Sequence, residues 1–203
     1  MKPDKRSAIV RSPIVIVPYA PRWPGEFRQL GATLRRALGG LALRIDHIGS
    51  TAVPGLAAKD IIDIQVTVKR LVPAAPVADA LVPVGYTIRP DIVRDHQPRG
   101  DSRAADEWAK LYFAPPAGQR PTHLHVRAEG RANQRYPLLF RDYLRSCAEA
   151  TAAYAEVKRQ LARRFADDIE AYYDLKDPVC DIIIAAAESW AREVGWNPGG
   201  SDA

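Results

Sequence analysis

The run of residues from 46 to 56 constrains the fold of this chain more than any other feature. Its sequence, DHIGSTAVPGL, predicts a strand that ends in a Gly-Ser turn opening toward a helix. A second predicted strand, residues 61–68, carries Asp63 and Gln65 on one face, because side chains alternate along a strand. A carboxylate in this position is typical of sites that hold magnesium against phosphate groups. We therefore predict a domain built around the turn, with Mg²⁺ held by Asp63 and Gln65.

The turn itself has the residues that a phosphate site needs. Gly49 lets the backbone pass close to a phosphate, and Ser50 adds a hydroxyl donor beside the N–H groups of the helix start. We expect Gly49, Ser50 and Thr51 to hold the phosphates, with Lys59 adding a point charge. No G-x-S-x-G elbow, Walker loop or G-x-G-x-x-G motif is present. The predicted catalytic residues are Asp63 and Ser50, the latter as a phosphate-binding serine.

Hydrophobic periodicity predicts the remaining elements. Short strands are expected over 13–18, 43–48, 85–89, 111–114 and 122–127, and helices over 27–41 and 73–83. The C-terminal third is helical, and its last helix is expected to begin at Asp177 with Pro178 in the first turn. The polar loop from 90 to 106 is long, which is typical of a lid, a binding element or a disordered segment. The tail 197–203 is expected to be disordered.

Length and composition predict one domain in a reducing compartment. The 203 residues, 47% of them hydrophobic, suffice for one core without disulfides. Cys147 and Cys180 are far apart and lack metal-site spacing, and no apolar run is long enough for a signal peptide or a membrane span. We expect a cytoplasmic protein of one domain over 1–203, with a sheet-containing core at 14–127 and C-terminal helices at 132–195.

Positive charge is concentrated in one segment. Residues 127–164 contain nine basic and four acidic residues, so this segment alone accounts for the formal net charge of +5. Such an excess favours an anionic partner, or else a solvated helix face. Arg127, Arg135 and Arg141 are the candidate anion clamps, because guanidinium groups bind phosphate through two hydrogen bonds. Nucleic acid is not the expected partner, because exposed aromatic residues do not alternate with the basic ones.

A His-x-His motif supports a phosphate or metal site, and several short motifs point to a family. His123 and His125 share one face of a predicted strand, which suits a common metal or phosphate ligand. Together with the 46–56 run, several short motifs resemble the GrpB family of the nucleotidyltransferase-like superfamily. These are Tyr19 with Trp23-Pro24, Trp108-Ala109-Lys110, His123-Leu124-His125-Val126-Arg127, and Asn133-Gln134-Arg135-Tyr136 leading to Phe140-Arg141-Asp142-Tyr143-Leu144.

The resemblance covers about residues 14 to 190 and implies an α+β, nucleotidyltransferase-like fold, a small mixed sheet flanked by helices with a C-terminal helical portion. A related domain occurs fused to dephospho-CoA kinase. Members of the superfamily usually carry two carboxylates on the motif strand and a third on a later strand. Here the motif strand has Asp63 and then Gln65, and the later strand corresponds to His123 and His125.

Two functions therefore remain open. One is a Mg²⁺-dependent nucleotidyltransferase that binds a nucleoside triphosphate, or another phosphate-bearing small molecule, and transfers a nucleotidyl group to a small acceptor. The alternative is a non-catalytic binding or assembly module that keeps the fold without turnover. Gln65 favours the second function, and the polar turn favours the first. The sequence indicates neither the acceptor, the base nor the oligomeric state.

Overall fold

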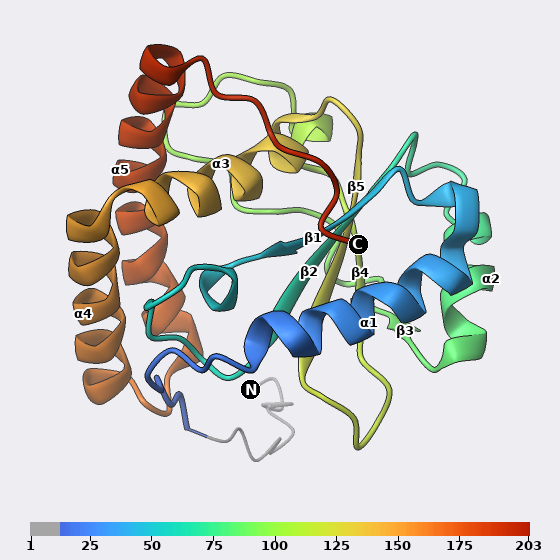
Figure 1. The fold of residues 1–203 in the computed structure, drawn as a ribbon, viewed down its shortest axis with the longest axis horizontal. Coiled ribbons are helices and arrows are strands. Elements are labelled where there is room, and N and C mark those ends of the chain that lie inside the picture. The colour runs from blue at the N-terminus through green and yellow to red at the C-terminus, as the bar shows by residue number, and fades with distance from the viewer. Residues whose placement is uncertain (1–12) are drawn as a thin grey trace, which may run out of the picture.

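Within residues 13–203, which the computed structural model describes, five strands form one mixed sheet in the order β1-β2-β5-β4-β3 (Figure 1). The strands are β1 (Arg44–Ile48), β2 (Ile62–Val68), β3 (Thr87–Ile88), β4 (Leu111–Ala114) and β5 (Thr122–Ala128). The central strands β2 and β5 run parallel, and every other neighbouring pair is antiparallel. Parallel pairing places the motif strand directly beside the His-x-His strand, so their alternating side chains meet on the same face.

One face of the sheet is apolar and packs against α1 (Trp23–Leu38) and α2 (Ala75–Leu81). The even-numbered residues of β2 and β5 point to this side, among them Ile62, Ile64 and Leu124, all fully buried. Burying one such side chain contributes about 1.5–3 kcal/mol relative to leaving it exposed. This layer therefore holds the sheet rigidly and leaves its other face for polar residues.

The opposite face lies toward three C-terminal helices, α3 (Ala132–Ser146), α4 (Ala148–Arg164) and α5 (Ile169–Val194). Figure 1 shows α4 and α5 standing together at one side of the sheet, away from α2. These helices pack on one another through a separate apolar cluster that includes Leu144, Tyr154 and Ile183. The α+β fold with a C-terminal helical portion is thus confirmed. In the same part of the chain, no helix is both long and apolar enough to cross a membrane.

Two expected elements differ from the structure. The predicted strand at 13–18 makes a single bridge, Val17 to Ala58, because the prolines that flank it lack N–H donors. The last helix begins at Ile169 and not at Pro178, and its N-cap is Asp168, whose carboxylate accepts from the backbone N–H of Ala171. Pro178 lies inside α5 on its exposed side, where a carbonyl that loses its helical partner can bond water.

The tail 197–203, expected to be disordered, instead lies along β1, and Figure 1 shows the chain returning to the sheet there. The Arg44 guanidinium donates to the carbonyls of Gly199 and Gly200. The backbone N–H of Asp202 donates to Ile45, and the Asp202 carboxylate accepts from the backbone N–H of His47. Because β1 is an edge strand with unpaired backbone groups, the tail gains bonds that an isolated segment lacks.

Candidate functional site

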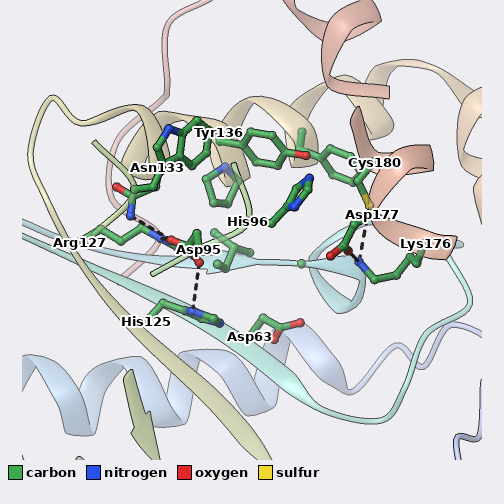
Figure 2. Close-up of a pocket in the computed structure, with 15 residues that line it drawn as sticks. Asp63, Asp95, His96, His125, Arg127, Asn133, Tyr136, Lys176, Asp177 and Cys180 are labelled. Atoms are coloured by element: carbon green, nitrogen blue, oxygen red, sulfur yellow. Dashed lines mark hydrogen bonds and ion pairs between the residues drawn. The ribbon is translucent and has the colours of Figure 1, made fainter. Parts of the chain in front are cut away.

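A cleft separates the polar face of the sheet from the C-terminal helices. Its larger part is a cavity of about 670 Å³ lined by the Gly-Ser turn, by β2, β4 and β5, and by α4 and α5. A smaller cavity of about 240 Å³ adjoins it and is shown in Figure 2. The two share the lining residues Gly49, Asp63, Asp95, His125, Lys176 and Asp177. The volume of the larger cavity is in the range of sites for small molecules.

Asp63, His123 and His125 meet on the floor of this cleft, as their common strand face predicts. Asp63 lies in register with His123, and an Asp63 oxygen is 2.9 Å from His123 Nδ1. Burial opposes ionisation of Asp63, but the hydrogen bond from His123 and nearby positive charges outweigh it and lower its pKa. Burial, with the charges of Arg127 and Lys110, holds the pKa of His125 well below its usual value. At neutral pH Asp63 is therefore a carboxylate and His125 a neutral imidazole.

The close approach of Asp63 requires glycine at position 49. Its φ of +69° is one that side chains rarely adopt, and a Cβ placed there would lie 2.2 Å from Asp63 Oδ2. The sequence alone suggested that this glycine admits a phosphate; the structure shows that it admits the Asp63 carboxylate. The turn and the motif strand therefore form one unit.

Ser50 and Thr51 follow in a single 3₁₀ turn, Ser50–Ala52, in place of a longer helix. The Ser50 hydroxyl lies at the cleft and accepts a hydrogen bond of 2.8 Å from Lys158 Nζ. The Thr51 hydroxyl is buried and pairs at 3.0 Å with His47, whose ring stacks on Phe27. Thr51 thus fixes the turn to the apolar layer, and Ser50 faces the space where a ligand fits.

Lys59 and Lys158 stand out among the basic residues of the cleft. Lys59 Nζ donates to the Tyr173 hydroxyl at 2.8 Å, and Lys158 donates to Ser50 and to a backbone carbonyl. Among residues 13–203, neither ammonium has a carboxylate within ion-pair distance, whereas Lys110 and Lys176 are each paired with an aspartate. Burial lowers the pKa of Lys158 to about 7. Lys158 occupies the buried face of α4, four residues after Tyr154, and a lysine at that spacing is a signal for a functional role.

We expect the stability contribution of Lys158 to depend on pH. The groups around it are the Ser50 hydroxyl, the Ala57 carbonyl, the Tyr154 ring, and the charges or thiol of Asp63, Arg159, Lys176 and Cys180. An unfolded lysine titrates near pH 10.4. Between about pH 7 and 10 the unfolded state therefore binds more protons, and stability rises with pH. For this single group, the free energy of unfolding can change by at most about 1.4 kcal/mol per pH unit.

Urea denaturation from pH 6 to 9 tests this expectation. The free energy of unfolding of the wild type, minus that of Lys158→Met, should increase with pH above about 7. Lys69→Met is the matched control, because Lys69 is exposed and lines none of the cavities described here. Parallel pH profiles for the wild type and Lys158→Met would contradict the expected titration.

Asp95, from the long loop, is the centre of a buried ion-pair network (Figure 2). Its carboxylate accepts two hydrogen bonds from Arg127 at 2.8 Å, one from Lys110 at 2.7 Å and one from Asn133 at 2.9 Å. Burial opposes its ionisation, but Arg127 and Lys110 outweigh this and hold its pKa well below the usual range. Sequence patterns missed Asp95 because the loop has no periodicity; the length of the loop was the only signal.

Gln65 does not face the ligand space, which corrects its prediction as a metal ligand. Its side chain is fully buried, its oxygen accepts from Arg127 at 2.7 Å, and its nitrogen donates to the Gln134 carbonyl at 2.9 Å. Both polar atoms are therefore already bonded within the fold. The Arg127 guanidinium likewise donates hydrogen bonds to Asp95 and Gln65. It therefore borders the smaller cavity with its charge paired to the Asp95 carboxylate.

Arg135 and Arg141 lie outside the cleft, so neither is placed to act there as the anion clamp that the sequence predicted. Arg135 is on the outer surface, where it pairs with Glu188 and stacks over Trp196. Arg141 is buried and binds Asp142 and Asp202. The basic segment 127–164 is thus largely neutralised by structural ion pairs, since a guanidinium finds partners wherever the fold offers carboxylates. Of its nine basic residues, only Arg127 and Lys158 line the two cavities.

The amino-acid sequence of this chain is similar to those of several known proteins. The family model described as "GrpB protein" matches residues 13–186. A dephospho-CoA kinase of Mycolicibacterium paratuberculosis is 37% identical over 203 residues, which cover 94% of this chain and 50% of that protein. The chain therefore spans about half the length of the curated kinases it matches. The UPF0157 protein BH1888 of Halalkalibacterium halodurans is 34% identical, covering 87% of this chain and 83% of that one.

A solved structure supports the same fold. The crystal structure of the conserved protein GrpB from Enterococcus faecalis aligns with a TM-score of 0.71 and 28% sequence identity. The alignment covers 87% of this chain and 99% of that chain. The sheet and the C-terminal helices that enclose the cleft are thus a shared architecture.

Proposed function

The chain belongs to the GrpB family, and from that premise we propose that its cleft binds a phosphate-bearing small molecule, such as a nucleotide. The observation that carries this proposal is the position of Lys59 and Lys158. Both ammonium groups lie at the cleft without a carboxylate partner among residues 13–203, and Lys158 contacts Ser50 of the motif turn. A partly buried cation is stabilised by an anion that brings its own negative charge. Phosphate groups meet that requirement.

The rest of the larger cavity suits the organic part of such a ligand. The side chains of Tyr112, Tyr172 and Tyr173 line it together with Ile61 and Ile92. Aromatic and aliphatic walls with a few charged groups are typical of sites for small molecules. The relatives named dephospho-CoA kinase match this chain over about half of their own length.

A transfer reaction would use the charged groups around the motif turn. Lys59 and Lys158 would hold phosphate oxygens and stabilise the negative charge that develops on them. Asp63 is the one carboxylate of the motif strand, and it faces this space. These groups support the nucleotidyltransferase function predicted from the resemblance, with the ligand oriented by fixed charges.

The binding or assembly module remains the second candidate, and a specific contact favours it. Gln65, where a second carboxylate is usual in the superfamily, is bonded to Arg127 and to Gln134. The motif strand therefore brings a single carboxylate to the cleft. Incubation with nucleoside triphosphates and a panel of small hydroxyl and amine acceptors separates the two candidates: a nucleotidylated acceptor with released pyrophosphate supports transfer, and binding without release supports the module.

We expect inorganic triphosphate and nucleoside triphosphates to bind in calorimetric titrations, and Lys59→Met to weaken that binding about tenfold, or about 1.4 kcal/mol. The reason is the loss of a charge-assisted contact in a partly enclosed cleft. Lys69→Met removes the same charge from an exposed position outside the cleft and should leave the affinity unchanged. The absence of heat with every phosphate compound, or equal losses in the two variants, would contradict the proposal.

A further inference from the structure

Three metal-binding side chains come together in the cleft from two neighbouring parallel strands. Asp63 of β2 lies opposite His123 of β5, and His125 follows on the same face. One ligand atom from each residue lies within 4.8 Å of the other two. The three side chains are 26%, 30% and 14% exposed, so all can be reached from the cleft. Ligand atoms of one transition metal ion lie up to about 4 Å apart, so small side-chain rotations would bring these three onto one ion.

The magnesium ion expected from the sequence does not fit this set of donors. Mg²⁺ prefers oxygen ligands in octahedral geometry, with carboxylates and water. Here two of the three donors are imidazole nitrogens, and the Gln65 oxygen is bonded to Arg127 and does not reach the cavity. Two imidazoles with one carboxylate are a set that suits Zn²⁺ and Fe²⁺, with coordination positions left open.

We propose that Asp63, His123 and His125 form a binding site for a divalent first-row transition metal ion of the Zn²⁺ or Fe²⁺ type, and not for Mg²⁺. Neighbouring residues contact one of the three ligands, His125. His125 Nδ1 lies 3.3 Å from Lys110 Nζ and 4.0 Å from an Asp95 oxygen, and Figure 2 shows its ring between Asp95 and Asp63. Outer carboxylates orient the histidine ligands of metal sites, and Asp95 is the carboxylate beside His125.

The proposed ion would lie beside the cations that are assigned to phosphate binding. Asp63 lines the same cavity as Lys59 and Lys158, so a metal ion on Asp63 adds positive charge where phosphate groups are expected. When bound, such an ion supplies Lewis-acid polarisation of a phosphoryl oxygen. This role in phosphate binding rests on the proposed function, whereas the metal site itself does not need the phosphate ligand.

Titration of the chelator-treated protein with Co²⁺ and Zn²⁺, without any phosphate compound, tests the site. We expect one ion per chain, visible Co²⁺ absorption without a thiolate band, and no displacement by millimolar Mg²⁺. Asp63→Asn and His123→Gln should each weaken binding about 100-fold, since loss of an outer-shell group alone costs about 10–100-fold. His96→Gln and Cys180→Ser are the matched controls, because both residues line the adjoining cavity outside the three-ligand cluster. Both controls should bind as the wild type does.

Three results would overturn the inference. They are no uptake of Co²⁺ or Zn²⁺ by the folded wild type, uptake in Asp63→Asn and His123→Gln equal to that of the wild type, or displacement of the bound ion by Mg²⁺. Circular dichroism of each variant shows whether it is folded, and His123, which is partly exposed, provides a second variant if Asp63→Asn does not fold. Lys59-dependent triphosphate binding in excess chelator would support the proposed function even if the metal inference failed. Metal uptake without any triphosphate binding would support the metal site and contradict the proposed function.

Discussion

Replacing Asp95 with alanine is expected to lower the free energy of unfolding by about 3–5 kcal/mol, the range for removal of one partner from a buried ion pair. Arg127 and Lys110 are both buried, at 4% and 8% exposure, and both bond to this carboxylate. Without it, two positive charges would remain in the interior with no anion between them. Asn133 would also lose one of its two acceptors and keep only the Ala109 carbonyl. The variant should therefore unfold at a much lower urea concentration than the wild type.

Asp91→Ala is the matched control for this prediction, because Asp91 belongs to the same loop. Its pair with Arg89 is exposed on both sides, and exposed pairs contribute about 0–1 kcal/mol. Urea denaturation at pH 7 measures both variants. A loss below about 1 kcal/mol for Asp95→Ala would show that the network does not depend on this carboxylate.

The same carboxylate gives the stability a defined pH dependence. Its pKa is lower in the folded protein than in the unfolded chain, where an aspartate titrates near 3.9. The ion pairs of Asp95 are therefore fully present above that pH, and their contribution is lost as the pH falls below it. The wild type and Asp95→Ala should thus differ most near neutral pH, and their difference should shrink between about pH 4 and 2.

Gly49→Ala is the second substitution for which we expect a large effect, a loss of about 4 kcal/mol in the free energy of unfolding. Two costs of about 1–3 kcal/mol each combine: backbone strain at a position that only glycine adopts readily, and overpacking. The new Cβ would lie 2.2 Å from Asp63 Oδ2 and 2.8 Å from Asp63 Cβ. Because Asp63 Cβ is fixed by the β2 backbone, rotating the carboxylate away relieves only part of the clash. Asp63 should also lose its contact with His123.

Gly55→Ala separates the two costs. Gly55 also has a positive φ, +79°, but a Cβ there would meet nothing within 4 Å. This control should therefore lose only the strain of a left-handed backbone, about 1–2 kcal/mol. Thermal and urea unfolding of the two variants would measure the difference, and equal losses would show that the contact with Asp63 is not what requires glycine at position 49.

Local patterns were sufficient to predict the floor of the cleft, and the resemblance that the motifs carry implied the fold class. Side-chain alternation is a property of the strand backbone itself, so Asp63, His123 and His125 could be assigned to strand faces from their positions alone. The Gly-Ser turn and the motifs around it indicated the GrpB family, which the family match confirms. The α+β architecture was implied by that resemblance, whereas periodicity predicted the individual helices and strands.

Contacts between distant segments decided the rest. The sequence marks Arg127, Arg135 and Arg141 as alike, but only the fold determines which carboxylate each one meets. Gln65 has the position of a metal ligand on its strand and is nevertheless bonded to Arg127.

Packing also overrode two local signals. Pro178 marks a helix start, but α5 runs through it because residues on both sides, Tyr172 and Cys180, pack into the helical layer. The polar tail is ordered because the β1 edge offers it hydrogen bonds.

The sequence by itself thus determined most of the elements, the family and the residues that share a strand face, since these depend on neighbours along the chain. The tertiary structure alone decided that Lys158 joins Lys59 at the cleft, that neither has a carboxylate partner among residues 13–203, and that Asp95 pairs with both Arg127 and Lys110. The physical reason is that the charge state and the partners of a buried group depend on what surrounds it in space, and those surroundings come from segments far away in the sequence.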